Sequence, residues 1–142
     1  MPEKATLERA RRDLRAGKRP STAAGEFVRE EIEHIREGKH GARSAKQAIA
    51  IGLSKARRAG VPLKPPEPGK TSERTRRSAK RAYEVGQGRR KAKAPSARRS
   101  QATIGALRRE GGAAASKRAL SAHARRAARR RPAARAGRNA AR

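Results

Sequence analysis

The chain has 142 residues, and its 40 Lys and Arg against 12 Asp and Glu give a formal net charge of +28. It has no Cys, which excludes disulfides and thiolate zinc sites, and no apolar run of the about 20 residues that span a bilayer. Only 15 residues are Leu, Ile, Val or Phe, so most of the chain is expected to lack a core.

The excess of positive charge favours a polyanion as partner, because each cation that meets a phosphate releases condensed counterions. A GC-rich genome would also raise Arg, Ala and Gly, but it would not lower the number of acids. Residues 1–66 hold 16 basic and 8 acidic groups, whereas residues 67–142 hold 24 and 4. We therefore predict an all-α protein with four parts: a basic helix in 1–20, a helical hairpin in 21–61, a Pro-rich linker in 62–69, and a low-complexity Arg/Ala-rich tail in 70–142.

The first predicted helix covers residues 6–16 and is short. Thr6 is its expected N-cap, and Gly17 follows its end. Leu7, Ala10 and Leu14 fall on one side, which would pack against the hairpin.

The second predicted helix covers residues 23–37, after a break at residues 20–22, and ends at Gly38. Its two stripes are apolar and acidic, and they lie nearly opposite each other. The apolar stripe is Val28, Ile32 and Ile35, and the acidic stripe is Glu26, Glu30, Glu33 and Glu37. We interpret the acidic stripe as a solvated face; alternatively it docks the basic tail or repels DNA from that side.

The third predicted helix covers residues 45–59. Ser44 and Gln47 form a capping-box pattern at its start, and Gly60 suits a left-handed residue after its end. Small residues at 45, 48 and 52 border its apolar face and would let another helix pack close. The hairpin, helix-turn-helix-like in outline, is expected to be held by Phe27, Val28, Ile32, Ile35, Ile49 and Leu53.

Three tail stretches have helical potential: residues 72–85, 100–110 and 115–130. Each has at most two large apolar side chains, and the last has no acid, so like charges oppose it in free solution. We expect a largely disordered tail whose helices form on a polyanion.

No pattern indicates catalysis, a cofactor or a small-molecule substrate, and we expect a protein that is not an enzyme. Gly69-Lys70-Thr71 resembles the end of a P-loop, but Lys64 stands where a Gly is required. We expect no metal site either, and interpret His34, His40 and His123 as surface residues, with His40 near a phosphate as an alternative.

The predicted nucleic-acid-binding residues are cations in two groups. The hairpin group is Arg43, Lys46, Lys55, Arg57 and Arg58, although a helix dipole also favours the last three. The tail group is Arg76, Arg77, Lys80, Arg81, Arg108, Arg109, Arg118, Arg125, Arg126, Arg129, Arg130 and Arg131. Residues 115–130 could form a basic amphipathic helix, but Leu120 alone offers too little apolar surface for a membrane. Arg suits bidentate phosphate contacts, and the scarcity of aromatics argues against stacking on single strands.

The segment from Gly25 to Gly60, and its Lys46-Gln47-Ala48-Ile49-Ala50-Ile51 core above all, resembles a family of small basic bacterial proteins that are mostly uncharacterised. Some members carry names such as DNA-binding protein or plasmid stabilisation protein. The resemblance implies a DNA partner and supplies no catalytic residues.

We expect a non-catalytic, nucleoid-associated type of protein that binds the phosphate backbone of duplex DNA with little sequence preference. Two alternatives stay open. One is an RNA- or ribosome-associated protein, and the other is a protein-interaction module whose acidic hairpin binds a partner while the tail localises it. The charged first twelve residues lack an apolar stretch of signal-peptide type, so we expect a cytoplasmic, nucleoid location.

Overall fold

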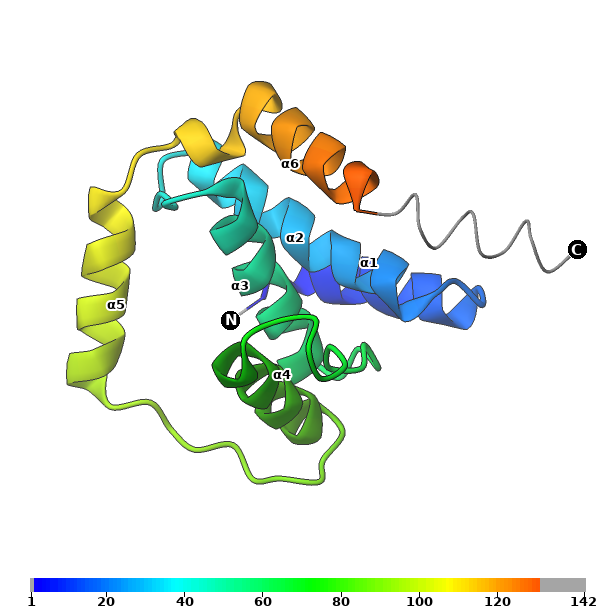
Figure 1. Cartoon of the computed structure of the whole chain (residues 1–142). Helices are drawn as coiled ribbons and strands as arrows, with labels where there is room; N and C mark the ends of the chain where they lie inside the picture. Colours follow the sequence, from blue (N-terminus) through cyan, green and yellow to red (C-terminus); the bar gives the residue numbers. More distant parts are fainter. Residues whose placement is uncertain (1, 131–142) are drawn as a thin grey trace, which may run out of the picture.

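The structure, a computed structural model, describes residues 2–130, and the regular secondary structure of these residues is entirely helical. The predicted all-α class is therefore confirmed. The helices follow in chain order: α1 (Lys4–Arg15), α2 (Pro20–Arg36), α3 (Ala45–Arg58), α4 (Glu73–Gly86), α5 (Ala97–Arg109), the short 3₁₀ helix η1 (Ala113–Ala115) and α6 (Lys117–Arg129). Helices α1, α2 and α3 form the centre, α4 packs on α3, and α5 stands apart on one side (Figure 1).

The first helix begins differently from the sequence prediction. Glu3, and not Thr6, is at the N-cap position of α1. Thr6 lies buried in the first turn, where its hydroxyl donates a 3.2 Å hydrogen bond to Glu30 Oε1. The predicted apolar side of α1 is confirmed in the three residues that pack on the core: Leu7, Ala10 and Leu14.

Helix α2 begins at Pro20, three residues before the predicted start. Pro20 occupies the first turn, where its fixed φ suits a helix and its missing N–H costs nothing, so a residue taken for a breaker is an initiator. The end is as predicted, because Gly38 follows with a φ of +77°.

The predicted start and end of α3 are confirmed to within one residue. The Ser44 side chain accepts a hydrogen bond from the Gln47 backbone N–H at 3.1 Å. Gln47 Oε1 reaches back to the backbone N–H of Arg43 at 2.6 Å, one residue before the position that a capping box uses. Gly60 follows the helix with a φ of +101°, and Val61 after it is buried in the core.

Helices α2 and α3 pack closely because α3 presents small residues to α2. A Cβ at Gly52 would lie only 2.6 Å from the Cα of Val28, so the two backbones touch at this point. The other apolar residues that α3 buries are all alanines, namely Ala45, Ala48 and Ala56. Phe27 is fully buried in the larger of two core clusters, whose other buried members are Ala10, Ala23, Ala24, Ala56 and Val61. The second core cluster contains Ile35, Ala42, Ala48, Ala114 and Ala115.

The predicted core was only partly right. Phe27 and Ile35 are buried, and Val28, Ile32 and Leu53 are half-buried. Ile49 is half-buried but belongs to neither core cluster, because the alanine face of α3 occupies the interface with α2.

The tail forms helices where the sequence predicts a largely disordered segment, at least over the described residues 70–130. Helix α4 packs on α3 through Ala79 and Ala82, and a Cβ at Gly86 would overlap the carbonyl oxygen of Arg57. Small side chains thus allow the backbones of α3 and α4 to pack closely, although this interface has few large apolar side chains. The chain between α3 and α4 has no regular secondary structure, as expected for the Pro-rich linker.

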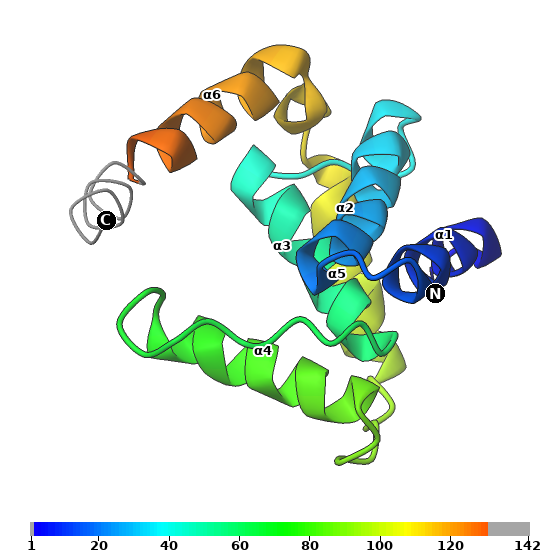
Figure 2. The ribbon, with the colours of Figure 1, turned by 90° about the vertical axis from the view of Figure 1, so that its right-hand side faces the viewer.

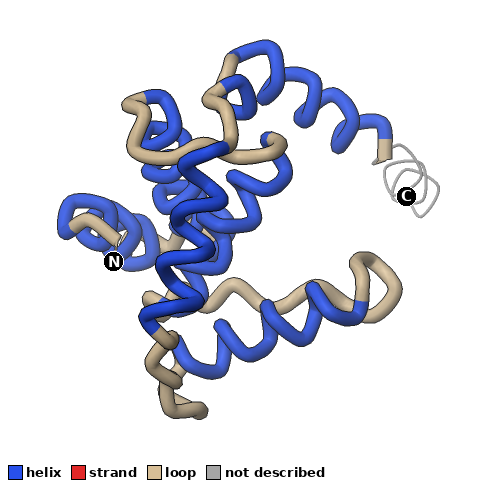
Figure 3. Tube along the Cα trace, turned by 90° about the vertical axis from the view of Figure 1, so that its left-hand side faces the viewer, coloured by secondary structure: helices blue, strands red, loops and turns tan. Residues whose placement is uncertain are grey.

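Helix α5 has no buried residue and is attached mainly through its C-terminal end. The backbone N–H of Gly41 donates to the Leu107 carbonyl at 2.8 Å, and that of Ala42 donates to the Gly111 carbonyl at 3.3 Å. Helices α4 and α6 extend toward the same side of the molecule, with α3 between them (Figures 2 and 3). No helix among the described residues is long and apolar enough to cross a membrane.

Candidate nucleic-acid interface

Three of the five predicted hairpin cations are exposed. Arg43 and Lys46 lie at the N-terminal end of α3, and Arg58 lies at its C-terminal end. Between them lie the small residues Ala50, which is exposed, and Ser54, which is half-buried, and neither would hinder the approach of a large ligand.

Lys55 is committed to an ion pair within the protein. Its ammonium nitrogen bonds to Oε1 of Glu31, a carboxylate from α2 that is only 1% exposed. Freeing Lys55 for a phosphate would leave the buried charge of Glu31 less compensated, which carries a large penalty. The assignment of Lys55 to the interface is therefore corrected.

Arg57 is also corrected, because it is buried and holds the Pro-rich segment. Its Nε donates to the carbonyl of Leu63 at 3.1 Å, and its Nη2 donates to the carbonyl of Lys64 at 3.4 Å. Burial lowers the pKa of Arg57 by removing water from the guanidinium. These contacts fold the linker back on the end of α3.

Helix α4 turns a basic face outward, opposite the alanines that contact α3. Arg77 and Arg81 share this face with Arg74, which the sequence analysis missed, and Lys80 is also exposed. An open concavity of about 410 Å³ lies along the face, and its lining is Glu73, Arg74, Arg77, Ser78 and Arg81.

Glu73 partly neutralises this face. Its carboxylate accepts two hydrogen bonds from Arg76, at 3.0 and 3.1 Å, and lies 3.6 Å from Arg77 Nε. These arginines, and the hydrogen bond from Arg76 above all, hold the pKa of Glu73 below its ordinary value of 4.5 and raise that of Arg76. Arg76 and Arg77 are thus less free for a ligand than Lys80 and Arg81.

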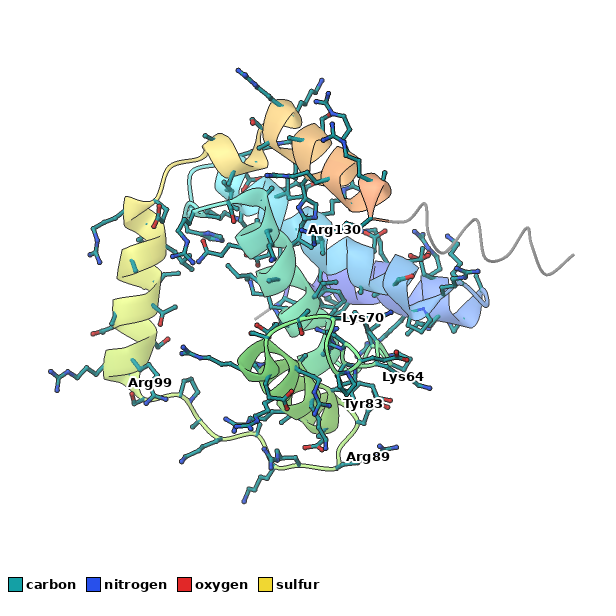
Figure 4. The ribbon with its side chains drawn as sticks, in the orientation of Figure 1. Lys64, Lys70, Tyr83, Arg89, Arg99 and Arg130 are labelled. Atoms are coloured by element: carbon teal, nitrogen blue, oxygen red, sulfur yellow. The ribbon has the colours of Figure 1, made fainter. Side chains whose placement is uncertain are left out.

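The cations of α5 lie on an exposed helix. Arg108 and Arg109 are in its last turn, and Arg98 and Arg99, absent from the predicted set, are in its first. Arg99 and Arg89, the latter in the α4–α5 connection, lie at the outer edge of the molecule (Figure 4).

Helix α6 has the densest unpaired positive charge of the described chain. It contains no Asp or Glu, and among residues 2–130 no ion pair involves any of its cations. The exposed cations are Lys117, Arg118, Arg125, Arg126 and Arg129, with Arg130 at the C-cap. Lys117 was missed by the sequence analysis, and Arg131 lies outside the described residues.

The acidic stripe of α2 is not a solvated face throughout, and that prediction is wrong at two of its four positions. Glu30 is buried, and it accepts the backbone N–H of Glu3 at 2.6 Å at the N-terminus of α1, where a helix favours negative charge. Glu26 pairs with Arg9 at 2.8 Å, and this contact raises the pKa of Arg9. Glu26 and Glu30 therefore contact the N-terminal helix and, within residues 2–130, not the basic tail, while Glu33 and Glu37 stay exposed.

The prediction that His34 and His40 are surface residues is wrong. The side chains of His34 and His40 are 15% and 9% exposed, and both adjoin Glu31. In the sequence, only the short spacing between Glu31, His34 and His40 hints that they could lie together. That spacing does not reveal that the loop after α2 folds back over the helix.

The two parts of the chain therefore differ in how far their acids and cations are paired. In α1–α3 the acids pair with local cations, as in Arg9–Glu26, Lys18–Asp13 and Lys55–Glu31. In α4–α6 most cations have no acid within reach, so the electrostatic potential of the described chain concentrates there.

Comparison with protein-family models, with curated proteins and with solved structures finds no match to this chain, so the resemblance to small basic bacterial proteins stays a prediction from the sequence.

Proposed function

We propose that the protein binds nucleic acid through its phosphate backbone, with duplex DNA preferred, and that α6 and α4 supply most of the contacts. The observation that carries this proposal is the row of exposed arginines on α6, which have no acidic partner among the described residues. Uncompensated arginines on one short helix repel one another, and a polyanion relieves that repulsion.

The arrangement of the helices favours contact from two directions. Helices α4 and α6 extend toward the same side, and the exposed N-terminal end of α3 lies between them (Figure 2). In this proposal Arg43 and Lys46 touch the same nucleic acid as Arg81 and Arg125. In this proposal the α2–α3 pair is helix-turn-helix-like only in that the N-terminal end of its second helix, α3, contacts the nucleic acid.

Backbone contacts imply little sequence preference, because phosphates carry no base identity. The only aromatic side chains are Phe27, which is buried, and Tyr83, which is half-buried on α4. Stacking on unpaired bases needs exposed rings. A nucleoid-associated role follows from this reading, in a protein without catalytic function.

Direct titration tests the proposal. The full chain is titrated onto two unrelated labelled duplexes, and the complexes are then competed with a structured RNA at equal phosphate concentration. The proposal expects closely similar affinities for the two duplexes and weaker competition by RNA. Stronger competition by RNA would assign the protein to RNA, and no binding to either polymer would overturn the proposal.

A variant with the five arginines of α6 and its C-cap changed to Gln locates the interface. The changes are at Arg118, Arg125, Arg126, Arg129 and Arg130. A matched control removes five exposed cations of the first helix and its flank: Lys4, Arg11, Arg12, Arg15 and Arg19. The α6 variant should lose far more affinity than the control. Equal losses would show that only total charge matters.

A further inference from the structure

A cluster of titratable side chains lies outside the set of cations assigned to the proposed interface. Glu31 and His34 come from α2, and His40 comes from the loop that follows it. One ligand atom from each of the three lies within 4.8 Å of the others. Glu31 is only 1% exposed, so its carboxylate needs a cation or hydrogen bonds close by.

The hydrogen bond of His40 Nδ1 determines whether its other ring nitrogen, Nε2, carries a hydrogen in the neutral side chain. Nδ1 lies 2.9 Å from the carbonyl oxygen of Gly41, which can only accept, so Nδ1 carries a hydrogen. Nε2 lies 3.1 Å from Oε2 of Glu31, which as a carboxylate also only accepts. A neutral His40 therefore turns a lone pair toward a carboxylate, an arrangement that requires a cation, either a proton or a metal ion.

His34 shows the same orientation. Its Nε2 lies 3.1 Å from Oε1 of Glu3, and the hydrogen bond from His34 lowers the pKa of that carboxyl. Glu3 is thus a carboxylate at neutral pH, and Nε2 donates to it. The other nitrogen, Nδ1, is left facing Glu31 Oε1 at 4.0 Å.

From this geometry we propose that Glu31, His34 and His40 bind a divalent transition-metal ion, and Zn²⁺ fits best. Two neutral imidazoles and one carboxylate are a common protein ligand set for zinc. The second ring nitrogen of each histidine donates to a carbonyl or a carboxylate, as metal-binding histidines do. Tetrahedral ligands at about 2.0–2.1 Å from zinc lie about 3.3 Å apart, so the cluster needs only a small contraction.

A nearby carboxylate adds a second, independent observation. Glu30 Oε2 is buried without a hydrogen-bond partner among the described residues, and Glu30, Glu3 and His34 form an overlapping group within the same 4.8 Å limit. A buried carboxylate with one unpartnered oxygen therefore adjoins the cluster, and the positive charge of a divalent ion there would stabilise it.

Lys55 is the internal competitor for this ion, because its ammonium nitrogen already bonds to Glu31 Oε1. The metal uses Oε2, which faces His40, and it can share the carboxylate with Lys55 at some cost in affinity. The site links α2 to the loop over residues 38–44 and, through Glu3, to the start of α1. Metal binding should therefore stabilise the packed part of the protein, independently of any nucleic acid.

Metal titration of the full chain without nucleic acid tests the proposal. Co²⁺ serves as the spectroscopic probe, and Zn²⁺ as the competitor. We expect one equivalent of Co²⁺ to give visible ligand-field bands of a four- or five-coordinate ion, Zn²⁺ to abolish them, and Zn²⁺ to raise the melting temperature. His40→Ala should weaken binding by about 10–100-fold or more. The matched control His123→Ala, on α6, should leave it unchanged.

Lys55→Gln keeps the test informative if His40→Ala does not fold. Removing the competing ammonium should tighten Co²⁺ binding, whereas a cluster held only by ion pairs would be destabilised without any metal response. Absence of the bands in both the parent chain and Lys55→Gln would overturn the proposal. So would equal binding by the parent, His34→Ala and His40→Ala proteins.

Discussion

Helices α3 and α5 are nearly equal in length, at 14 and 13 residues, and each has a glycine in its interior, but they differ in what surrounds them. Gly52 of α3 lies against the backbone of α2 at Val28, whereas a Cβ at Gly105 of α5 would approach only the mobile end of Arg109, at 3.7 Å. Helix α3 buries five residues and α5 buries none.

The comparison shows that the packing of a helix in this protein depends more on small residues than on large apolar ones. Both α3 and α4 pack through alanine and glycine, which let backbones approach closely where large side chains are scarce. Helix α5 has two large apolar residues, the exposed Ile104 and the half-buried Leu107, and it buries neither of them.

Truncating one isoleucine in each region should give the largest contrast. Ile35 is 3% exposed and belongs to the second core cluster, whereas Ile104 is 38% exposed. Ile35→Ala should cost about 2–5 kcal/mol of unfolding free energy, and Ile104→Ala should change it by less than about 0.5 kcal/mol. Chemical denaturation followed by circular dichroism measures both. Equal losses would mean that α5 is packed as firmly as α2.

Adding one methyl group to each glycine should give effects of opposite sign. Gly52→Ala forces α2 and α3 apart and should cost about 1–3 kcal/mol. Gly105→Ala meets no backbone and should stabilise α5 by about 0.5–1 kcal/mol through helix propensity. Far-UV circular dichroism at 222 nm should therefore show less helix for the first variant and slightly more for the second. Tolerance of Gly52→Ala would contradict the close packing described for α3.

The smallest effect concerns Glu73, the acid that partly neutralises α4. Its pKa is below the ordinary 4.5 in the folded protein, so its contribution to the stability of α4 is present at neutral pH and is lost as the pH falls from about 4.5 through the folded value. The parent chain should therefore lose some helicity at acid pH, and Glu73→Gln should remove this pH dependence. The variant should also bind DNA slightly more tightly, since Arg76 and Arg77 become free. Glu110→Gln, which removes an exposed acid outside α4, is the control. If both variants titrate alike, the ion pair has no such role.

Several helix ends were predictable from sequence because capping is a local matter. Ser44 with Gln47, Gly38 and Gly60 act within one turn of chain, and each was placed correctly. Pro20 was expected to be a helix breaker. A proline can either begin a helix or end one, and the local sequence does not show which of the two flanking segments is helical.

Burial of charged residues was not predictable, because it depends on contacts distant in sequence. A solvated glutamate stripe and one that covers a neighbouring helix have identical spacing, so Glu30 gave no sign of its contact with Glu3 and Thr6. Arg57 looked like a helix-end cation and is instead buried against the carbonyl of Leu63. His40 reaches Glu31 only because the loop folds back.

The salt dependence of DNA binding tests the central claim most directly, because its slope counts the phosphates neutralised. With about ten contacts the full chain should show a slope of log K against log salt near −9. Changing the five arginines of α6 and its C-cap to Gln should make the slope shallower by up to about 4.5, at about 0.9 per contact. The control without five cations of the first helix and its flank should keep nearly the full slope. Equal slopes for all three proteins, or equal decreases in both variants, would contradict the assignment of phosphate binding to α6.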